Sequence, residues 1–547
     1  MVRRPQSNRF PRRVAPDGVP FRGCPRRASP SSGRAPIIHV VGDQAAGAIR
    51  FESTAGRWIV AVSVLGSGVA FLEATVVNVA LPEIGRDLGA DTGSLQWTLN
   101  GYLVTLSALI LLGGSLGDRL GRRLIFNIGV VWFTVASAVC ALAPSVELLV
   151  AARVLQGVGG ALLTPGSLAI IEATFRPQDR ARAIGAWSGL GGVAAAVGPL
   201  LGGYLVDTVS WRAIFLINVP LGVFVVAMAN RHVPETRDPT AVGRLDYPGA
   251  ILVVVGLASA TYALIGASGN AGTTTILLSG AAGVVGLGGF VVTERRSANP
   301  MMPLSIFASR QFTAANLVTF AVYAALGGVF FLLVAFLQIS LGYSAIAAGA
   351  ASLPVTALML LLSPRAGALA QRIGPRLPLT LGPLLIAAGM LLMTGIDRGD
   401  AYTTSVFPAV FVYGLGLALV VAPVTATVLA AADDRHSGVA SGVNNAVARV
   451  AGLIAVAVLP LIAGLSGPDF LDPDAMAEGF GVAMVATAAL AVAGALLAWF
   501  TIDAKVLETA PATPGEPEVR ARPDRHCAIA GTPLRARQPS LETHPPG

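Results

Sequence analysis

The chain has 547 residues, of which 54% are hydrophobic and only 12% are charged, and its mean hydropathy is +0.69. This leaves too little polar surface to cover a soluble globule of this size, so the composition predicts a membrane protein. The net charge of +8 comes almost entirely from arginine, since Lys505 is the only lysine. A Walker-type ATP site needs a lysine after its glycines, so the sequence excludes ATP hydrolysis by that route.

The glycine and cysteine contents indicate which kind of membrane protein the chain forms. The 63 glycines let membrane helices pack with close backbones, while the aromatic content is only 6%, which favours a helical bundle over a barrel. Cys24, Cys140 and Cys527 form neither a disulfide framework nor a metal-ligand spacing. We therefore expect no metal and no cofactor.

Taken in order, the chain reads as a tail, a series of apolar segments and a second tail. Residues 1–56 are rich in Arg, Pro and Gly and show no helical or strand period, so they predict a disordered basic tail without a signal peptide. Residues 504–547 read as a second disordered tail. Between the tails we count fourteen apolar segments, each long enough to cross about 30 Å of hydrocarbon: 58–81, 95–117, 124–143, 146–172, 183–206, 213–231, 247–267, 274–293, 313–339, 345–363, 378–396, 405–431, 440–464 and 480–502.

Arginine gathers in alternate loops between these segments, starting with the one that holds Arg119, Arg122 and Arg123, whereas the intervening loops contain only Arg86, Arg212 and Arg398. Short cytoplasmic loops accumulate arginine. The pattern predicts a multi-pass protein of the cell membrane with both termini in the cytoplasm.

Two pairs of similar segments, separated by the same offset, indicate an internal repeat. "GSLGDRLGRR" from Gly114 returns as "GALAQRIGPR" from Gly367, and "GAWSG" from Gly185 returns as "GVASG" from Gly438; both offsets are 253 (367 − 114 and 438 − 185). Duplicated bundles are the usual plan of secondary transporters. We expect a six-helix bundle at 57–232, a linker with two extra membrane helices at 233–300, and a second six-helix bundle at 301–503.

A carboxylate inside the first apolar segment is the strongest candidate for function. Glu73 lies eight residues before Leu81, roughly 12 Å below the outer end of the segment, and Arg153 lies about as deep in the fourth segment. Charges at that depth cost several kcal/mol unless they are paired, so they are functional candidates by default. We interpret Glu73, with Arg153 and Gln156, as a site for a coupling proton or a cationic substrate; a static ion pair that fastens two helices is the alternative.

Two further stretches are rich in glycine, and their residues by themselves predict structural roles. "GSLGDRLGRRLIF" predicts a tight, anchored cytoplasmic turn, with Gly114, Gly117, Asp118, Arg119, Gly121, Arg122 and Arg123 as its motif residues. The fifth segment, "GAWSGLGGVAAAVGPLLGG", predicts a bend and a close packing face, through Gly185, Gly198, Pro199, Gly202 and Gly203.

These stretches together resemble the major facilitator superfamily, and in particular its fourteen-spanner drug:proton antiporter branch. The loop from Gly114 is similar to the superfamily's Gly-x-Leu-x-Asp-Arg-x-Gly-Arg-Arg gating loop, and the fifth segment to its antiporter signature, with Ala194 in place of one glycine. "RVLQGVGGALLTP" from Arg153 resembles the fourth-span signature, in which the arginine is associated with proton transfer. "FLEATVVNVALP" is similar to the branch's first-span motif, with Glu73 where the family has aspartate.

The resemblance covers about 57–502 and implies the all-α major facilitator fold, two six-helix bundles plus two extra central helices. "WRAIFLINVPLG" from Trp211 and "PLSIFASRQFTAAN" from Pro303 also look like this branch. Three residues have no clear role: Asn78 in the first segment, Arg449 inside the thirteenth, and Asp246 at the start of the seventh, which we interpret as a helix cap. For Arg449 we leave open backbone carbonyls, an anionic substrate group, or a place nearer the cytoplasmic edge.

The expected function is proton-coupled export of small lipophilic, in part cationic, compounds by alternating access. The expected partners are the substrate, protons and the lipid bilayer, with no nucleic acid and no ATPase, and the protein is expected to act as a monomer. Export of a dedicated metabolite, such as a polyketide, siderophore or amino acid, is the first alternative. A membrane-embedded enzyme or scaffold is a remote one, because no His-Glu-x-x-His, Gly-x-Ser-x-Gly or Cys/His cluster is present; we expect that the protein is not an enzyme.

Overall fold

The structure, a computed structural model, is described for residues 49–238, 245–267, 271–297, 300–432 and 437–507. The two tails expected to be disordered lie outside these residues except for their innermost parts. The described chain is helical throughout apart from turns and one isolated β-bridge, between Ile49 and Phe175. The fold is therefore the all-helical one that the sequence predicts.

Each predicted segment corresponds to one helix or to two consecutive helices, and several helices extend beyond the predicted ends. The first group is α1 (Thr54–Leu88), α2 (Thr92–Leu120), α3 (Arg122–Ala141), α4 (Val146–Thr174), α5 (Pro177–Thr208), α6 (Ala213–Leu216) and α7 (Asn218–His232). Two helices follow, α8 (Tyr247–Ala267) and α9 (Thr273–Arg296). The last group is η1 (Leu304–Ala308), α10 (Arg310–Ile339), α11 (Ala345–Ala351), α12 (Leu353–Ile373), α13 (Arg376–Met393), η2 (Tyr402–Val406), α14 (Phe407–Ala430), α15 (Ser437–Ile462), η4 (Gly467–Leu471) and α16 (Pro473–Thr501).

The number of spans agrees with the sequence. Within the described residues, thirteen helical stretches are long and apolar enough to cross a membrane, with α6 and α7, α11 and α12, and η2 and α14 each forming one stretch. The remaining predicted segment is α5, whose 32 residues are also long enough. Small polar residues begin several spans: Asp91, for example, accepts the backbone N–H of Ser94 at 2.8 Å at the start of α2.

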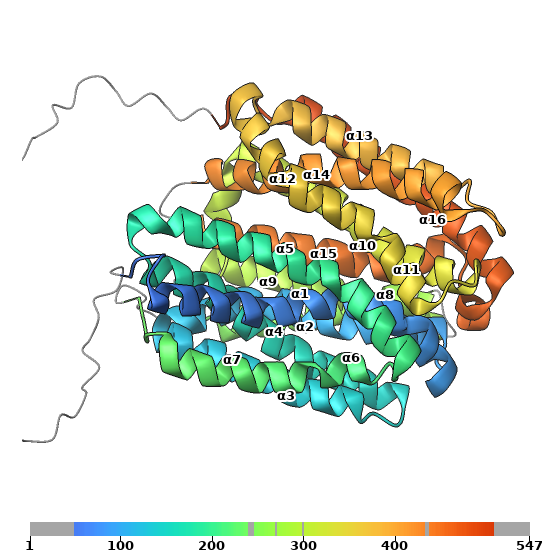
Figure 1. Ribbon diagram of the computed structural model, residues 1–547, viewed down its shortest axis with the longest axis horizontal. Coiled ribbons are helices and arrows are strands. Elements are labelled where there is room, and N and C mark those ends of the chain that lie inside the picture. The colour runs from blue at the N-terminus through green and yellow to red at the C-terminus, as the bar shows by residue number, and fades with distance from the viewer. Residues whose placement is uncertain (1–48, 239–244, 268–270, 298–299, 433–436, 508–547) are drawn as a thin grey trace, which may run out of the picture. The chain divides into compact units, whose positions relative to one another are not determined.

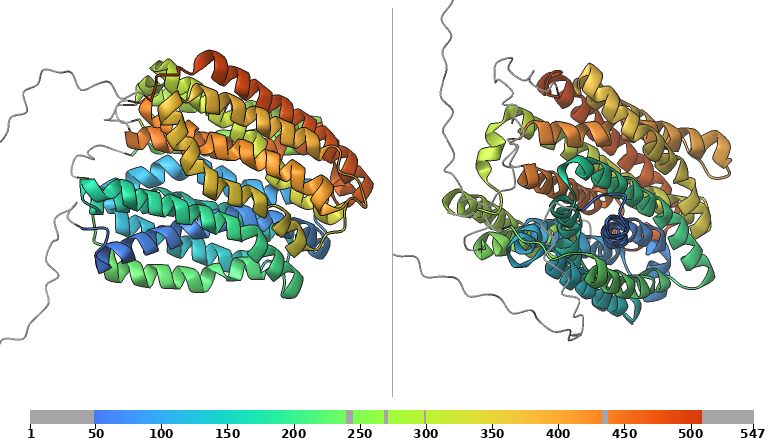
Figure 2. Two further views of the ribbon diagram at one scale, coloured as in Figure 1. Left: turned by 45° about the horizontal axis from the view of Figure 1, so that its top comes forward. Right: turned by 60° about the vertical axis from the view of Figure 1, so that its left-hand side comes forward.

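The long helices run side by side (Figure 1) and pack in two sets. Helices α1–α7 contact mainly one another, through pairs such as α2 with α4 and α1 with α5, and helices α10–α16 do the same, through pairs such as α13 with α14. The extra helices α8 and α9 pair with each other, and α8 also contacts α2 and α15. Figure 2 shows α5 against the yellow helices α11 and α12, one of the seams between the two sets.

Corresponding contacts in the two sets carry the sequence repeat into the structure. Gly121 and Gly374 are 253 residues apart (374 − 121), and both have positive φ, of 129° and 84°, at the turn between two spans. Arg123 donates to the carbonyl of Val233, the C-cap residue just after α7, at 3.0 Å. Arg376, again 253 residues on (376 − 123), donates to the carbonyl of Ile502, the C-cap residue just after α16, at 2.7 Å.

Several polar contacts join the two sets at one end of the bundle, the end that carries the arginine-poor loops. Gln96 of α2 donates to the carbonyl of Val456 of α15 at 2.8 Å, and Gln338 of α10 donates to the carbonyl of Val79 of α1 at 2.9 Å. At the end of α5, the Asp207 carboxylate accepts the backbone N–H groups of Ala345 and Ile346, the first residues of α11, at 3.0 and 2.8 Å. The two sets are thus held together at the arginine-poor end.

Candidate functional site

Glu73 and Arg153, which the sequence places at matching depth, form an ion pair. Arg153 Nη1 lies 2.5 Å from Glu73 Oε1, and the side chains are 1% and 0% exposed. Glu73 is positioned by α1 and Arg153 by α4, two helices in direct contact. Burying an ion pair costs desolvation free energy unless further hydrogen bonds satisfy its remaining polar atoms. The groups around Glu73 and Arg153 therefore determine how stable the pair is.

Those groups come from α4 itself and from two more helices, α3 and α7. Asn218, the first residue of α7, donates to the second Glu73 oxygen, Oε2, at 2.8 Å. Gln156, one turn after Arg153 on α4, accepts from Arg153 Nη1 at 2.5 Å and donates to Ser137 Oγ at 2.7 Å. The hydroxyl of Ser137, on α3, also accepts a hydrogen bond from the Asn218 side-chain amide at 3.3 Å. The network therefore links α1, α3, α4 and α7.

Arg153 has acceptors besides Glu73. Its Nε donates to the backbone carbonyl of Thr98 at 2.9 Å, and its guanidinium lies 4.6 Å from the centre of the Tyr102 ring and 5.8 Å from that of Phe215. Because Gln156, Thr98 and the ring faces remain after Glu73 is neutralised, the arginine stays satisfied in either state of the carboxyl group. The arrangement leaves Arg153 hydrogen-bonded when Glu73 is neutral, while the charge of the arginine is then unpaired.

The glycine-rich loop from Gly114 is held by charged groups. Arg122 Nη2 pairs with Asp118 at 2.8 Å. Glu235, after α7, accepts the backbone N–H groups of Arg123 and Leu124 at 3.0 and 3.1 Å and so caps the start of α3. A Cβ on Gly121 would meet the Glu235 carboxylate at 2.7 Å, so glycine is needed for this approach as well as for the positive φ. Gly114 and Gly117 lie near the end of α2, and Arg119 lies in its last turn.

Most of the α5 motif serves close packing. A Cβ on Gly198 would overlap the Thr75 hydroxyl of α1, one on Gly202 would overlap Val76 of α1, and one on Gly203 would overlap the Ala345 carbonyl of α11. Pro199 is buried beside them, and its carbonyl is approached by Gly349 of α11. Gly185 is exposed and nothing lies within 4 Å of its Cβ position, so it takes no part in this seam.

The three residues without a clear role do not join the Glu73 network. Asn78 donates to the Ala74 carbonyl of its own helix at 3.2 Å. Asp246 accepts the backbone N–H of Gly249 at 2.9 Å, as expected of a cap at the start of α8. Arg449 is partly buried in the middle of α15 and has neither a hydrogen bond nor an ion pair within the described chain.

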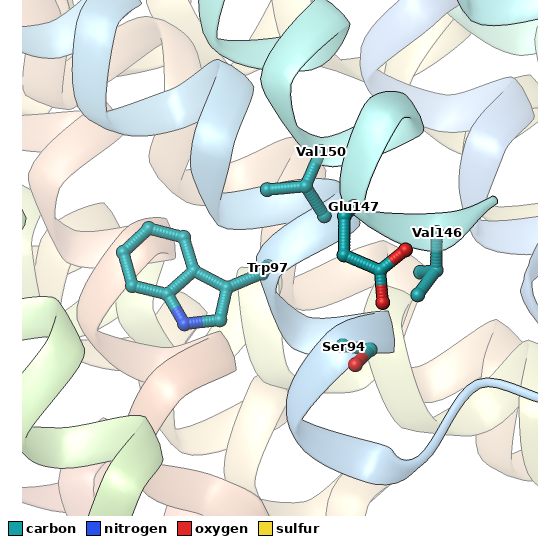
Figure 3. A pocket seen from close by; sticks show the side chains of 5 residues that line it. All are labelled: Ser94, Trp97, Val146, Glu147 and Val150. Carbon is teal, nitrogen blue, oxygen red and sulfur yellow. The ribbon is translucent and has the colours of Figure 1, made fainter. Parts of the chain in front are cut away.

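A shallow hollow of about 290 Å³ lies at the arginine-poor ends of α2 and α4, apart from the network (Figure 3). Its lining residues are Ser94, Trp97, Val146, Glu147 and Val150. None of them contacts Glu73 or Arg153 through a polar atom, so we do not include the hollow in the candidate site.

Asn218, Ser137 and Tyr102 were missed by sequence reasoning. Asn218 did have a signal, since it is a polar residue inside "WRAIFLINVPLG", the stretch already singled out. Ser137 and Tyr102 had none, because a serine or a tyrosine in an apolar helix is common and its direction depends on how the helices are rotated.

Comparisons with known proteins agree with this architecture. Residues 63–456 match the model of the Major Facilitator Superfamily. The chain is 35% identical over 398 residues to the multidrug resistance protein Stp of Mycobacterium tuberculosis, covering 72% of this chain and 73% of that one. It is 36% identical over 428 residues to the tetracenomycin C resistance and export protein of Streptomyces glaucescens (77% and 78% covered). The puromycin resistance protein pur8 of Streptomyces alboniger is 34% identical over 484 residues (85% and 95% covered).

Solved structures show the same fold at low sequence identity. A bacterial homologue of the lysosomal transporter Spinster matches with a TM-score of 0.58 and 17% identity, over 83% of this chain and 98% of that one. A D-xylose-proton symporter matches with a TM-score of 0.58 and 15% identity, over 83% and 99%. On the family match, the identities to relatives and the fold, this multi-pass membrane protein belongs to the major facilitator superfamily.

Proposed function

We propose that the protein exports small lipophilic compounds in exchange for protons, and that Glu73 is the group that binds the coupling proton. The observation that carries the proposal is the fully buried Glu73–Arg153 pair, whose arginine keeps other acceptors when the carboxyl group is neutral. The relatives named for drug resistance support the direction and the class of cargo.

Two packed sets of helices suit transport by alternating access. The contacts of Gln96, Gln338 and Asp207 join the sets at the arginine-poor end. With the arginine-rich loops in the cytoplasm of the cell, as the positive-inside rule indicates, these contacts close the outer side. The protein would then act as a single chain in the cell membrane, with both termini in the cytoplasm and no catalytic activity of its own.

The test is transport into everted membrane vesicles with an imposed pH gradient, using a lipophilic fluorescent dye. We expect Glu73→Gln to abolish gradient-driven transport, because glutamine keeps the size and hydrogen-bonding capacity of the side chain but cannot bind and release the proton. Glu73→Asp should retain part of the activity.

The matched control is Glu83→Gln on the same helix. Glu83 is 43% exposed and, among the described residues, pairs only with its neighbour Arg86, so this change should leave transport intact. Gradient-driven transport that persists in Glu73→Gln at the level of the Glu83→Gln control would exclude an obligatory coupling role for Glu73.

Export of one dedicated metabolite is the second candidate, favoured by relatives that are named for a single compound, tetracenomycin C or puromycin. Transport of that metabolite with no transport of a dye panel would favour this reading.

A further inference from the structure

Two carboxyl groups outside the Glu73 network are buried at one end of the extra helices α8 and α9. Asp246, the residue before α8, is 7% exposed, and Glu294, in the last turn of α9, is 3% exposed. Asp246 Oδ1 accepts the N–H of Gly249 at 2.9 Å, and Glu294 Oε2 accepts the N–H of Met302 at 3.1 Å. The second oxygen of each group, Asp246 Oδ2 and Glu294 Oε1, is buried and has no hydrogen-bond partner among the described residues.

The packing of α8 on α9 fixes the register between the two helices. A Cβ on Gly256 would meet the backbone and side chain of Leu287, and a Cβ on Gly283 would meet the backbone of Ala260. Four residues forward along α8 therefore correspond to four residues back along α9. The two helices are antiparallel, so the start of α8 lies beside the end of α9.

This register brings the two carboxyl groups together. Seven residues from the contact between Gly256 and Leu287, it pairs Gly249 with Glu294, and residues seven apart share a helix face. The Asp246 carboxyl group fills the space at Gly249, since a Cβ there would lie 2.9 Å from Asp246 Oδ2. Glu294 therefore faces the Asp246 carboxyl group across the α8–α9 seam, and the charge of Asp246 acts on Glu294.

No positive side chain forms an ion pair with either carboxyl group within the described residues. The titratable groups of the described chain at this end are Tyr247, Arg295 and Arg296, which are exposed, and Asp118 and Arg119 at the end of α2. The described part of α15, which also packs on α8, has no charged residue before Arg449.

Two buried carboxylates that face each other repel, so one of them is held in the protonated form unless a cation lies between them. A shared proton is the smallest ligand that satisfies both unpartnered oxygens, because a protonated carboxyl group donates one hydrogen bond and a carboxylate accepts it.

We propose that Asp246 and Glu294 bind one proton between them, as a protonation site separate from Glu73. The O–H of one group donates to the free oxygen of the other. Through the Glu294 bond to Met302, the pair joins the start of α8 and the end of α9 to the segment that leads into α10. Loss of the proton leaves two facing negative charges and loosens this junction. The inference does not depend on the proposed role of Glu73.

Infrared spectroscopy of the full chain in phosphatidylcholine nanodiscs tests the proposal, because the C=O stretch of a protonated carboxyl group is resolved from that of a carboxylate. We expect an acid band at neutral pH that disappears in alkaline solution and is missing from both Glu294→Gln and Asp246→Asn. All spectra are recorded in the Glu73→Gln background, so that a proton on Glu73 does not contribute. The matched control is Glu478→Gln, which changes an exposed carboxylate on α16 and should leave the band unchanged.

Thermal unfolding at several pH values gives a second measurement. A proton that the folded chain holds and the unfolded chain releases stabilises the fold at low pH, and this stabilisation is lost as the pH rises. The unfolding temperature should therefore fall between about pH 4, where a free carboxyl group ionises, and the pH at which the acid band disappears. Glu294→Gln should lack this fall, because its amide donates to Asp246 at every pH.

Two results would overturn the proposal: an acid band that persists in both amide variants, or an equal fall of the unfolding temperature in Glu294→Gln and the intact chain. Loss of the acid band on addition of millimolar Na⁺ or Mg²⁺ would reassign the pair to a metal cation. Because no transport is measured, a failure here is separate from a failure of Glu73 to couple transport to protons.

Discussion

Individual residues in this protein act through the partners that other helices bring to them. Glu73 receives one donor at each oxygen, Arg153 at Oε1 and Asn218 at Oε2. The arginine has further acceptors, whereas Oε2 has no donor other than Asn218 among the described contacts. Asn218 is therefore the residue on which the position of the carboxylate depends most after Arg153 itself.

We expect Asn218→Ala to destabilise the protein by about 1–3 kcal/mol, the usual cost of leaving a buried polar group without its partner. Asn218→Asp should cost more, because it places a second carboxylate beside Glu73. Thermal unfolding of the purified protein measures both effects. The control is Asn127→Ala, which removes an exposed amide contact to Asn230; equal losses at the two positions would show that Asn218 has no special place in the network.

At the scale of elements, one carboxylate joins two helices from different sets. Asp207 at the end of α5 caps α11 by accepting the N–H groups of Ala345 and Ile346. The glycines of the α5–α11 seam allow the backbones to approach, since a Cβ on Gly203 or Gly349 would overlap the backbone of the other helix. If alternating access parts the two sets at this end, this contact must break.

Asp207→Ala should therefore shift the protein toward a form that is open at the arginine-poor end. Hydrogen bonds to charged groups contribute about 1.5–3 kcal/mol, so the ratio of open to closed forms should rise roughly ten- to a hundredfold. Asp207→Asn, which keeps one acceptor oxygen, should have a smaller effect. Spin labels at Val209 and Tyr343 would report the distance between the two helix ends; an unchanged distance distribution in Asp207→Ala would contradict the role of this contact.

At the scale of the whole molecule, the two sets of helices repeat the same anchoring device. Arg123 donates to the carbonyl just after α7, and Arg376 donates to the carbonyl just after α16. Each arginine thus ties the first turn of one span to the last turn of another, in each half of the chain.

We expect Arg123→Ala and Arg376→Ala to lower the free energy of unfolding by similar amounts, about 1–3 kcal/mol each. Their effects should add in the double variant, because the two sites belong to different sets of helices and share no partner. Thermal unfolding of the single and double variants tests this, and a strongly unequal pair of losses would show that the two halves are anchored differently.

The sequence by itself determined the approximate number and positions of the spans, the duplication, and the equal depth of Glu73 and Arg153. These are properties of one helix at a time: length, hydropathy and position along a known rise per residue. The family followed from motifs that lie within single segments or turns.

Only the tertiary structure decided which side chains meet. Asn218, Ser137 and Tyr102 join the Glu73 network, Asn78 does not, and Asp207 reaches the backbone of a helix 138 residues away. The sequence left the depth of Arg449 open, and only the structure shows that it lies in the middle of α15 with no ion pair among the described residues. The physical reason is that contacts between helices depend on their relative rotation and vertical register, and neither is encoded in the hydropathy of a single segment.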